Sequence, residues 1–351
     1  MAGPERLITQ TLVDYEPPLI NGGFAGKHIL SVEQFQRGDL EELFSDARKI
    51  EDAVKKRKPV GHLCEGYVLA NLFFEASTRT DLSFQAAMRR LGGDVIVASN
   101  GVQFSSVYKG ENLPDTIRAV GCYADVIVLR HPDIGSTYIA ARALDKLNEK
   151  TGTVTTLISG GDGIGEHPSQ ALLDLFTIEY KKGTGPVIIT MVGDLNNGRT
   201  VHSLAKLLAV NGFSSVHVNF VSPDQLRIPQ EISEYMERAG ITIYETSNLL
   251  EVLGDTDVIY WTRIQEERFP NKEEYDAIKD SFIMTPDVLA KAKPDAILMH
   301  PLPRKHEMGT EEDHEILDAD PRSVYFDQME NGMYVRMALL RLVLGVKYLI
   351  P

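Results

Sequence analysis

One short turn of the sequence carries three hydroxyl groups and a guanidinium group. Ser77, Thr78, Arg79 and Thr80 follow the apolar run NLFF and open a segment with helical periodicity. Capping of a helix needs one hydroxyl, whereas the first N–H groups of a helix together with hydroxyls and an arginine bind an anion. We therefore predict an oxyanion site at this turn.

Arginines recur directly after the apolar runs of the sequence. They are Arg79, Arg130, Arg199 and Arg263. His167 and Gln170 flank the start of a further helical segment. Ligands of open α/β sheets bind beyond the carboxyl ends of strands, and guanidinium groups make paired contacts with phosphate and carboxylate. This placement predicts a guanidinium-lined cleft between two domains.

The elements that must position these side chains alternate between strands and helices. The predicted strands of the first series cover residues 67–74, 94–99 and 124–130, and residues 153–160 lead into a glycine-rich turn. The second series covers residues 187–194, 215–221, 256–263 and 295–303. We predict an α/β protein with two domains, each with a parallel sheet flanked by helices.

Apolar periodicity predicts the helices between these strands. One helix follows the Ser77–Thr80 turn and stops at Gly92-Gly93, and another covers about 136–150. A helix at 167–184 carries the chain from the first domain to the second, and the last helix, from 331, packs back on the first sheet. The predicted domains are 1–166 with 322–351, and 185–321.

Composition excludes several classes of function. The 351 residues are 43% hydrophobic and 25% charged, with a net charge of −14, so nucleic acid and an anionic membrane surface are not expected partners. No apolar run has the length of a membrane span, and the N-terminal residues do not resemble a signal peptide. Cys64 and Cys122 stand far apart in the sequence, which favours the reducing cytoplasm.

Other chemical motifs fit poorly. GDLNNGRT at Gly193 is neither a P-loop nor a dinucleotide fingerprint, and GGDGIGEH at Gly160 runs into His-Pro rather than following a strongly buried strand. The histidines are scattered without metal-ligand spacing, and no Ser-His-Asp arrangement is recognisable. We expect no metal, no cofactor and no covalent nucleophile.

Seven motifs together resemble one family of enzymes. They are ASTRT from Ala76, KGE from Lys109, LRHP from Leu129, HPSQALLDLFTI from His167, GDLNNGRTVHSL from Gly193, TRIQEERF from Thr262 and HPLPR from His300. In this order and spacing, from Leu69 to Gly345, they resemble the catalytic chains of aspartate carbamoyltransferases, within the aspartate/ornithine carbamoyltransferase superfamily.

The resemblance implies a carbamoyl phosphate site. Ser77, Thr78, Arg79 and Thr80 would hold the phosphate. Thr80, Arg130 and His167 would contact the carbonyl oxygen, so that Arg79, Thr80, Arg130 and His167 are the implied catalytic residues. The implied contacts of the amino group come from Gln170 and from the HPLP segment, at Pro301, Leu302 and Pro303.

The resemblance also implies the aspartate site and the assembly. Arg199, Arg263 and Gln265 would grip the two carboxylates of aspartate, with Lys109. Ser105 and Lys109 would come from the neighbouring subunit of a homotrimer with shared active sites. Glu75 and Arg268, near Arg199, would set domain closure. A regulatory subunit or an assembly with pathway enzymes is a further implied partner.

The implied reaction agrees with this inventory of side chains. The amine of L-aspartate attacks the carbamoyl carbon and forms a tetrahedral oxyanion. Phosphate then departs, which gives N-carbamoyl-L-aspartate for pyrimidine (UMP) biosynthesis. Such a transfer needs orientation and charge stabilisation rather than a protein nucleophile. A closed cleft would also exclude water from the acyl phosphate.

Three alternatives remain open. An ornithine carbamoyltransferase shares the Ser-Thr-Arg-Thr turn, but Arg199 and Arg263 favour a dicarboxylate and would repel a cationic side chain. A catalytically silent subunit would have lost site residues, and none of those carried over is missing. An NAD-dependent enzyme would need a fingerprint that is absent.

Overall fold

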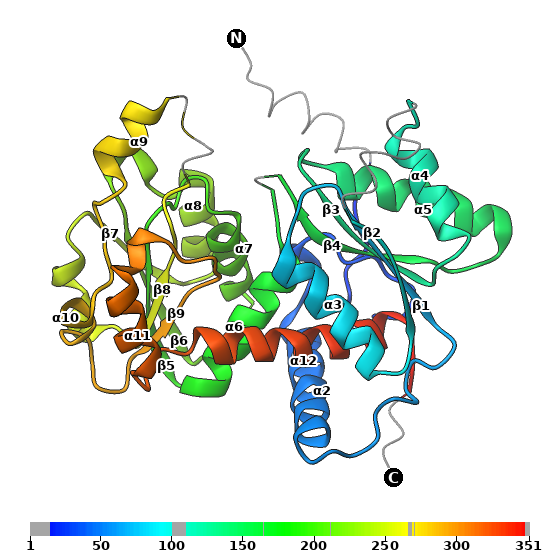
Figure 1. Cartoon of the computed structure of the whole chain (residues 1–351), viewed down its shortest axis with the longest axis horizontal. Coiled ribbons are helices and arrows are strands. Elements are labelled where there is room, and N and C mark those ends of the chain that lie inside the picture. Colours follow the sequence, from blue (N-terminus) through cyan, green and yellow to red (C-terminus); the bar gives the residue numbers. More distant parts are fainter. Residues whose placement is uncertain are drawn as a thin grey trace. The chain divides into compact units, whose positions relative to one another are not determined.

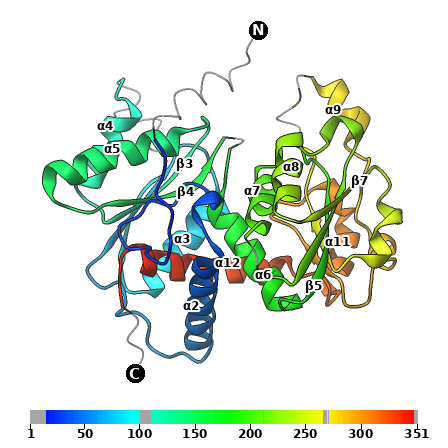
Figure 2. The same cartoon turned by 180° about the vertical axis from the view of Figure 1, so that it is seen from behind.

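The computed structural model describes residues 15–99, 110–163, 165–210, 212–265, 269 and 271–347. The chain forms two compact units, Met1–Leu172 with Gly332–Pro351, and Leu173–Asn331 (Figures 1 and 2). Each unit contains one parallel sheet, of four strands in the first and five in the second. This confirms the predicted fold class.

The sheet of the first unit has the strand order β2-β1-β3-β4. Its strands are β1 (Val68–Phe73), β2 (Asp94–Ser99), β3 (Val126–His131) and β4 (Thr156–Asp162). β1, β3 and β4 are buried almost throughout, as strands covered by helices on both faces must be. Because such strands appear as unbroken apolar runs, the sequence predicted β1 and β3 well.

Helices cover both faces of this sheet. They are α2 (Arg37–Lys55), α3 (Thr78–Arg90), α4 (Leu113–Gly121) and α5 (Ser136–Thr151), with a short 3-10 turn, η1 (Val32–Gln34). Apolar residues of α4 and α5 share one core cluster with residues of β1, β3 and β4. Figures 1 and 2 show α3 on the opposite face from α4 and α5.

The glycine-rich segment at Gly160 corrects one prediction. Gly160, Gly161 and Asp162 belong to β4, which is buried along its whole length, and the turn begins only at Gly163. The prediction that this motif does not follow a strongly buried strand was therefore wrong. The two glycines hid the strand because glycine normally weakens one.

The sheet of the second unit has the order β7-β6-β5-β8-β9. Its strands are β5 (Pro186–Val192), β6 (Ser215–Val221), β7 (Thr242–Thr246), β8 (Val258–Trp261) and β9 (Ile297–Met299). The α-helices of the unit are α7 (Arg199–Leu208), α8 (Gln230–Arg238), α9 (Lys272–Ile278), α10 (Pro286–Leu289) and α11 (Glu311–Ala319). Its 3-10 turns are η4 (Asp224–Leu226), η5 (Leu249–Glu251), η6 (Leu253–Asp255) and η8 (His306–Met308).

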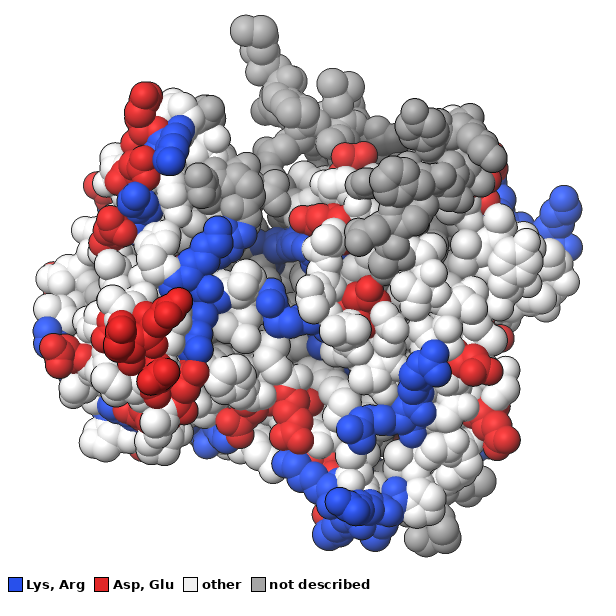
Figure 3. Space-filling model, viewed as in Figure 1, with Lys and Arg blue, Asp and Glu red and all other residues white. Residues whose placement is uncertain are grey.

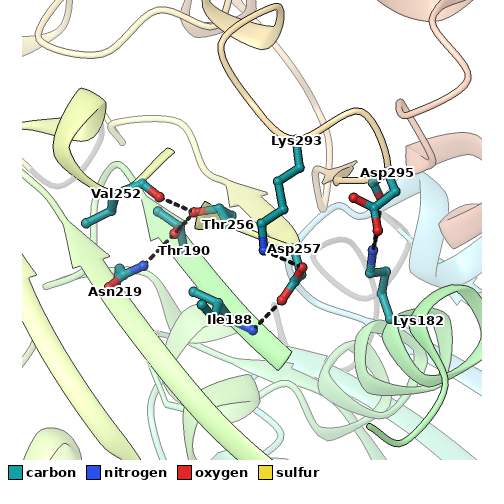
Figure 4. Close-up of polar contacts among 9 residues, drawn as sticks. All are labelled: Lys182, Ile188, Thr190, Asn219, Val252, Thr256, Asp257, Lys293 and Asp295. Carbon is teal, nitrogen blue, oxygen red and sulfur yellow. Dashed lines mark hydrogen bonds and ion pairs between the residues drawn. The ribbon is translucent and has the colours of Figure 1, made fainter. Parts of the chain in front are cut away.

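A carboxylate fixes the register at the amino end of β8 (Figure 4). The Oδ2 atom of Asp257 accepts a hydrogen bond from the Ile188 N–H at 2.9 Å, and the Asp257 N–H donates to the Ile188 carbonyl at 2.9 Å. The Ile297 N–H donates to the Asp257 carbonyl, also at 2.9 Å. Lys293 Nζ lies 2.9 Å from the other carboxylate oxygen. We call this arrangement a carboxylate clasp, since one aspartate joins three strands.

Other polar contacts support the same end of the sheet. Figure 4 shows the Thr190 hydroxyl between Thr256 and Asn219, at 2.6 and 3.0 Å, and Lys182 paired with Asp295 at 2.9 Å. The Thr256 hydroxyl lies within hydrogen-bonding distance of the Val252 carbonyl, at 2.8 Å. Buried hydroxyl and amide groups need such partners, so this end of the sheet is polar yet closely connected.

The first sheet contains an equivalent clasp. Asp125 accepts from the Val68 N–H through Oδ2 at 2.8 Å and donates its own N–H to the Val68 carbonyl at 2.9 Å. The Thr156 N–H donates to the Asp125 carbonyl at 3.0 Å. In both units, the same atoms of an aspartate that directly precedes one strand therefore join three strands near their amino ends.

Two helices contain the boundaries between the units. α6 (Pro168–Lys182) begins at a proline, as predicted, and is followed by Gly183 at φ +72°. α12 (Tyr325–Val343) starts six residues before its predicted start at Asn331, and from Gly332 onward it belongs to the first unit. The division between the units falls within α6 and within α12. The functional domains stay a prediction, with the first domain at 1–166 and 322–351, the crossing helix at 167–184 and the second domain at 185–321.

The end of α12 packs within the first unit. The Arg341 Nε atom donates to Asp46 of α2 at 2.5 Å, and both side chains are buried. The Arg336 guanidinium lies 5.1 Å from the ring centroid of Phe84 in α3. Within the described part of the chain, no helix is long and apolar enough to cross a membrane.

Candidate active site

The Ser77–Thr80 turn lies where β1 ends and α3 begins. Ser77 is the N-cap residue of α3, with extended backbone angles of −153° and 95°, but its side chain makes no capping hydrogen bond. The capping explanation of these hydroxyls is therefore not supported. The first N–H groups of α3 have no partner within the helix, and the helix dipole favours an anion there.

Arg130 lies within β3, one residue before the strand ends, and is 7% exposed. Its Nη1 donates to the Gly160 carbonyl at 3.2 Å, and its Nη2 lies 3.2 Å from the Glu75 carboxylate. Glu75 was predicted to serve domain closure; in this structure it pairs with Arg130. The two contacts hold the guanidinium in one orientation at the carboxyl end of the sheet.

His167 directly precedes α6 and is 4% exposed. Its Nε2 atom lies 3.2 Å from the Thr80 hydroxyl, which is also buried. The structure thus brings together two residues separated by 87 positions. Gln170 lies in the first turn of α6 and is buried. The predicted carbamoyl phosphate residues of the first unit therefore gather where β1 and β3 end and where α3 and α6 begin.

This first half-site is suited to one kind of chemistry. A tetrahedral anion can be held by the hydroxyls and N–H groups of the turn, and Arg79 stands exposed in the same first turn of α3. Arg130, His167 and Thr80 offer buried donors to a neighbouring carbonyl oxygen. In a buried setting such donors stabilise developing negative charge more strongly than water does.

The second half-site follows the neighbouring strands β5 and β8. Arg199 is the first residue of α7, and Arg263 and Gln265 come shortly after β8. Gln265 Nε2 donates to the Asn197 carbonyl at 3.1 Å. Two arginines and an amide that follow adjacent strands are suited to a ligand with two carboxylates.

Asp194 organises this second half-site. It is fully buried, and its carboxylate accepts hydrogen bonds from the Asn197 N–H at 2.9 Å and from the Gln265 N–H at 3.4 Å. Burial raises the pKa of Asp194, whereas the N–H groups of Asn197 and Gln265 and the charge of Arg263 oppose that rise. One carboxylate therefore connects the loop that precedes Arg199 with the loop that carries Arg263.

Gly193 allows the close approach of these two loops. It has a φ of +119°, and a Cβ atom there would lie 2.2 Å from the Thr262 carbonyl oxygen. The Thr262 N–H and hydroxyl each donate to the Val192 carbonyl at 2.9 Å. Any residue with a side chain would separate the ends of β5 and β8.

The HPLP segment follows β9 in the same unit. Leu302 has a positive φ of 54° and donates its N–H to His300 Nδ1 at 2.8 Å. His300 Nε2 lies 3.2 Å from Glu307, and the His300 N–H donates to the Gln328 side chain at 3.1 Å. Pro301, Leu302 and Pro303 are therefore held in one conformation, with their carbonyl groups in a fixed loop.

Sequence reasoning missed the buried aspartates that support both half-sites, Asp162 and Asp194. Each follows or ends a buried strand and precedes a glycine-containing turn, and that pattern was the available signal. Ser105, Lys109 and Arg268 lie outside the described residues. Among the residues that are described, no group of three or more histidine, cysteine, aspartate or glutamate side chains could hold a metal ion.

Surface charge is grouped despite the net charge of −14. Figure 3 shows Lys and Arg side chains gathered in separate groups on the face viewed, among mainly uncharged residues. Local groups of positive charge are what anion binding requires of an acidic chain.

Comparison with known proteins places the chain in a family. Residues 27–180 match the family model "Aspartate/ornithine carbamoyltransferase, carbamoyl-P binding domain", and residues 187–343 match "Aspartate/ornithine carbamoyltransferase, Asp/Orn binding domain". The two matches together span most of the chain and lie in the order of the two sheets.

Individual relatives agree. A multifunctional protein, CAD, of Squalus acanthias is 46% identical over 346 residues, which are 98% of this chain but only 14% of that protein. The aspartate carbamoyltransferase catalytic subunit of Dichelobacter nodosus is 46% identical over 327 residues, 92% of this chain and 90% of the subunit.

A solved structure is also similar. Aspartate transcarbamoylase of Trypanosoma cruzi, in complex with carbamoyl phosphate and aspartate, superimposes with a TM-score of 0.82 at 39% identity, covering 94% of this chain and 100% of that one. Both family models match this chain, and the relatives are similar to it in sequence over almost its whole length. The chain is a member of the aspartate/ornithine carbamoyltransferase family.

Proposed function

We propose that this chain is an aspartate carbamoyltransferase. It transfers the carbamoyl group of carbamoyl phosphate to the amino group of L-aspartate, giving N-carbamoyl-L-aspartate and phosphate in de novo pyrimidine (UMP) biosynthesis. The names of the D. nodosus and T. cruzi relatives support this activity. The observation that carries it is the buried group of Thr80, Arg130 and His167 beside the N-terminus of α3.

The first half-site accounts for the donor. Ser77, Thr78, Arg79 and Thr80 bind the phosphate, which leaves as an anion at the positive end of α3. Thr80, Arg130 and His167 donate hydrogen bonds to the carbonyl oxygen, so the tetrahedral oxyanion is stabilised without a covalent intermediate. The amino group of carbamoyl phosphate binds Gln170 and the carbonyl groups of Pro301 and Leu302, beside Pro303.

The second half-site accounts for the acceptor. Arg199, Arg263 and Gln265, with Lys109, bind the two carboxylates of L-aspartate. The α-amine must lose its proton before it attacks the carbamoyl carbon. Two guanidinium groups that follow β5 and β8 oppose the cationic side chain of ornithine, so the acceptor is a dicarboxylate.

The assembly is a homotrimer with shared active sites. Leu82, Ile96 and Val97, on α3 and β2, are 57%, 41% and 48% exposed, and the burial of such large apolar side chains by a neighbouring subunit supports this assembly. Ser105 and Lys109 follow β2 in the sequence and enter the neighbouring subunit's site. Glu75 and Arg268 serve domain closure.

The cellular setting is the cytoplasm, within an assembly of pathway enzymes. The chain spans 14–15% of the length of the multifunctional relatives it matches, and such proteins carry several activities on one polypeptide. Cys64 and Cys122 form no disulfide. A reducing compartment is consistent with two free thiols.

An acceptor assay tests this function. The protein is incubated with carbamoyl phosphate and either L-aspartate or L-ornithine, and the ureido product and released phosphate are measured. We expect equal amounts of N-carbamoyl-L-aspartate and phosphate, with little product from ornithine. Faster citrulline formation would establish the ornithine enzyme instead, and phosphate release without any ureido product would exclude carbamoyl transfer.

A further inference from the structure

Asp162, the last residue of β4, carries a buried carboxylate at the carboxyl end of the first sheet. Asp162 is 4% exposed. Its Oδ2 atom accepts hydrogen bonds from the Gly135 N–H at 3.0 Å and from the Thr137 hydroxyl at 3.3 Å. Its Oδ1 atom accepts from the Glu166 N–H at 3.0 Å. Both oxygens are therefore committed to donors from two different segments of the chain.

These two segments lead from and to residues of the donor site. Gly135 closes the turn that follows Arg130 and is the N-cap of α5. Asp162 reaches from β4 to accept hydrogen bonds from the backbone N–H of this N-cap residue and from the hydroxyl of Thr137 in the first turn of α5. Glu166 immediately precedes His167, so its N–H fixes the backbone from which the imidazole projects.

Close packing leaves these segments little freedom. A Cβ atom at Gly163 would lie 2.5 Å from the Pro132 carbonyl oxygen, and one at Gly165 would lie 2.5 Å from Asp162 Oδ1. The Gly165 N–H also donates to the Asp162 carbonyl at 2.8 Å. The segment that follows Asp162 therefore packs closely against the turn after Arg130, at Gly163, and against the Asp162 carboxylate, at Gly165.

Glu166 connects the same group to the N-terminal part of the unit. Its carboxylate accepts hydrogen bonds from the Ser31 hydroxyl and from the Val32 N–H, each at 2.9 Å. The residue before His167 is therefore held on two sides, by Asp162 through its backbone and by η1 through its side chain.

Burial of a carboxylate is unfavourable unless hydrogen bonds offset the free energy of its desolvation. An apolar residue at the end of β4 would avoid that desolvation cost. We propose that Asp162 is a positioning residue of the carbamoyl phosphate half-site, because its carboxylate ties the turn after Arg130 to the residue before His167. This inference rests on the proposed function. It assigns Asp162 no contact with either substrate.

The variant Asp162→Asn tests the proposal. Asparagine has the same shape but one acceptor oxygen, so its NH2 group must face either the Gly135 N–H or the Glu166 N–H. We expect the KM and the calorimetric Kd for carbamoyl phosphate to rise about tenfold or more, while the KM for aspartate at saturating carbamoyl phosphate changes less than about twofold. Asp133→Asn, an exposed carboxylate in the same turn, is the matched control and should bind as the wild type does.

Two results would overturn the proposal. One is an unchanged Kd for carbamoyl phosphate in Asp162→Asn, and the other is a lower kcat with both KM values unchanged, which a merely structural role would give. If Asp162→Asn does not fold, Gly165→Ala is judged by the same criteria, since its Cβ would displace Oδ1. The binding measurement needs no acceptor. Failure of the wild type to bind carbamoyl phosphate therefore contradicts the proposed function, whereas equal binding by wild type and variant contradicts only the role of Asp162.

Discussion

The Nε2 atom of His167 lies 3.2 Å from the Oγ1 atom of Thr80, and both side chains are buried. The contact joins the residue before α6 to the first turn of α3. A carbonyl oxygen placed beside this pair would meet polar groups whose positions are fixed before the substrate binds.

Loss of His167 should slow the chemical step more than it weakens binding. We expect His167→Ala to lower kcat by about 100-fold or more, because a donor to the oxyanion is removed. The KM for carbamoyl phosphate should change little, since the phosphate is held elsewhere. Steady-state kinetics check this, with His306→Ala as a control, a half-exposed histidine of η8. An unchanged kcat would remove His167 from the mechanism.

Loss of Arg263 should affect the acceptor alone. A charged hydrogen bond contributes about 1.5–3 kcal/mol, so Arg263→Ala should raise the KM for aspartate about 10- to 100-fold. Calorimetric binding of carbamoyl phosphate in the absence of aspartate should be unchanged. Arg227→Ala, an exposed arginine of the same unit, is the control. Weakened carbamoyl phosphate binding in Arg263→Ala would contradict the assignment of Arg263 to aspartate.

Mixing of two inactive variants should restore activity if the sites are shared. Arg79→Ala should lower turnover by several powers of ten because it removes a contact with the departing phosphate, and Lys109→Ala should do the same from the neighbouring subunit. Mixed trimers carry some sites with both residues intact. Activity after dissociation and reassembly is the measurement, and trimers of confirmed mass that remain inactive would count against shared sites.

The stability of the protein should depend on pH through Asp162. Burial raises the pKa of Asp162 to about 6, although hydrogen bonds from Gly135 and Glu166 oppose the rise; the charge of Glu166 adds to it. The folded state therefore binds this proton more tightly than the unfolded state, and the wild type gains stability as pH falls through 6. The carboxylate of Glu166 and the phenol of Tyr138 are the other ionisable side chains that interact electrostatically with this group.

Denaturation of wild type and Asp162→Asn at several pH values measures this contribution. Between about pH 7.5 and about pH 5, the difference in unfolding free energy should move in favour of the wild type by about 1 kcal/mol, because asparagine does not titrate. A difference that stays constant with pH would mean that the carboxyl titrates outside this range.

The central strands were predictable because of their surroundings. β1 and β3 are covered by helices on both faces, so their residues form unbroken apolar runs. β7 was not predicted. It lies at the edge of its sheet, and its five residues are mainly exposed or half-buried, so the sequence TIYET lacks an apolar pattern. Helix α2, with polar residues on one face, was also left without a prediction.

The site shows the same division. Arg199 and Arg263 were recognisable because a charged residue after an apolar strand is conspicuous. Asp162 was not, because Gly160 and Gly161 interrupt the apolar run of β4 and concealed a buried strand. Its hydrogen bonds join segments 27 and 4 residues away, and only the folded chain shows that they meet.

The matching clasps at Asp125 and Asp257 give both sheets the same construction at their amino ends. The order of β2, β1, β3 and β4 in one sheet is repeated by β6, β5, β8 and β9 in the other. The same arrangement of strands thus occurs twice. In each sheet an aspartate fixes the register at the amino ends of the strands, and the loops with the predicted site residues follow the carboxyl ends. If the proposed function holds, we expect exchange of the loops after β5 and β8 to change the amine that is bound while the two sheets keep their strand order.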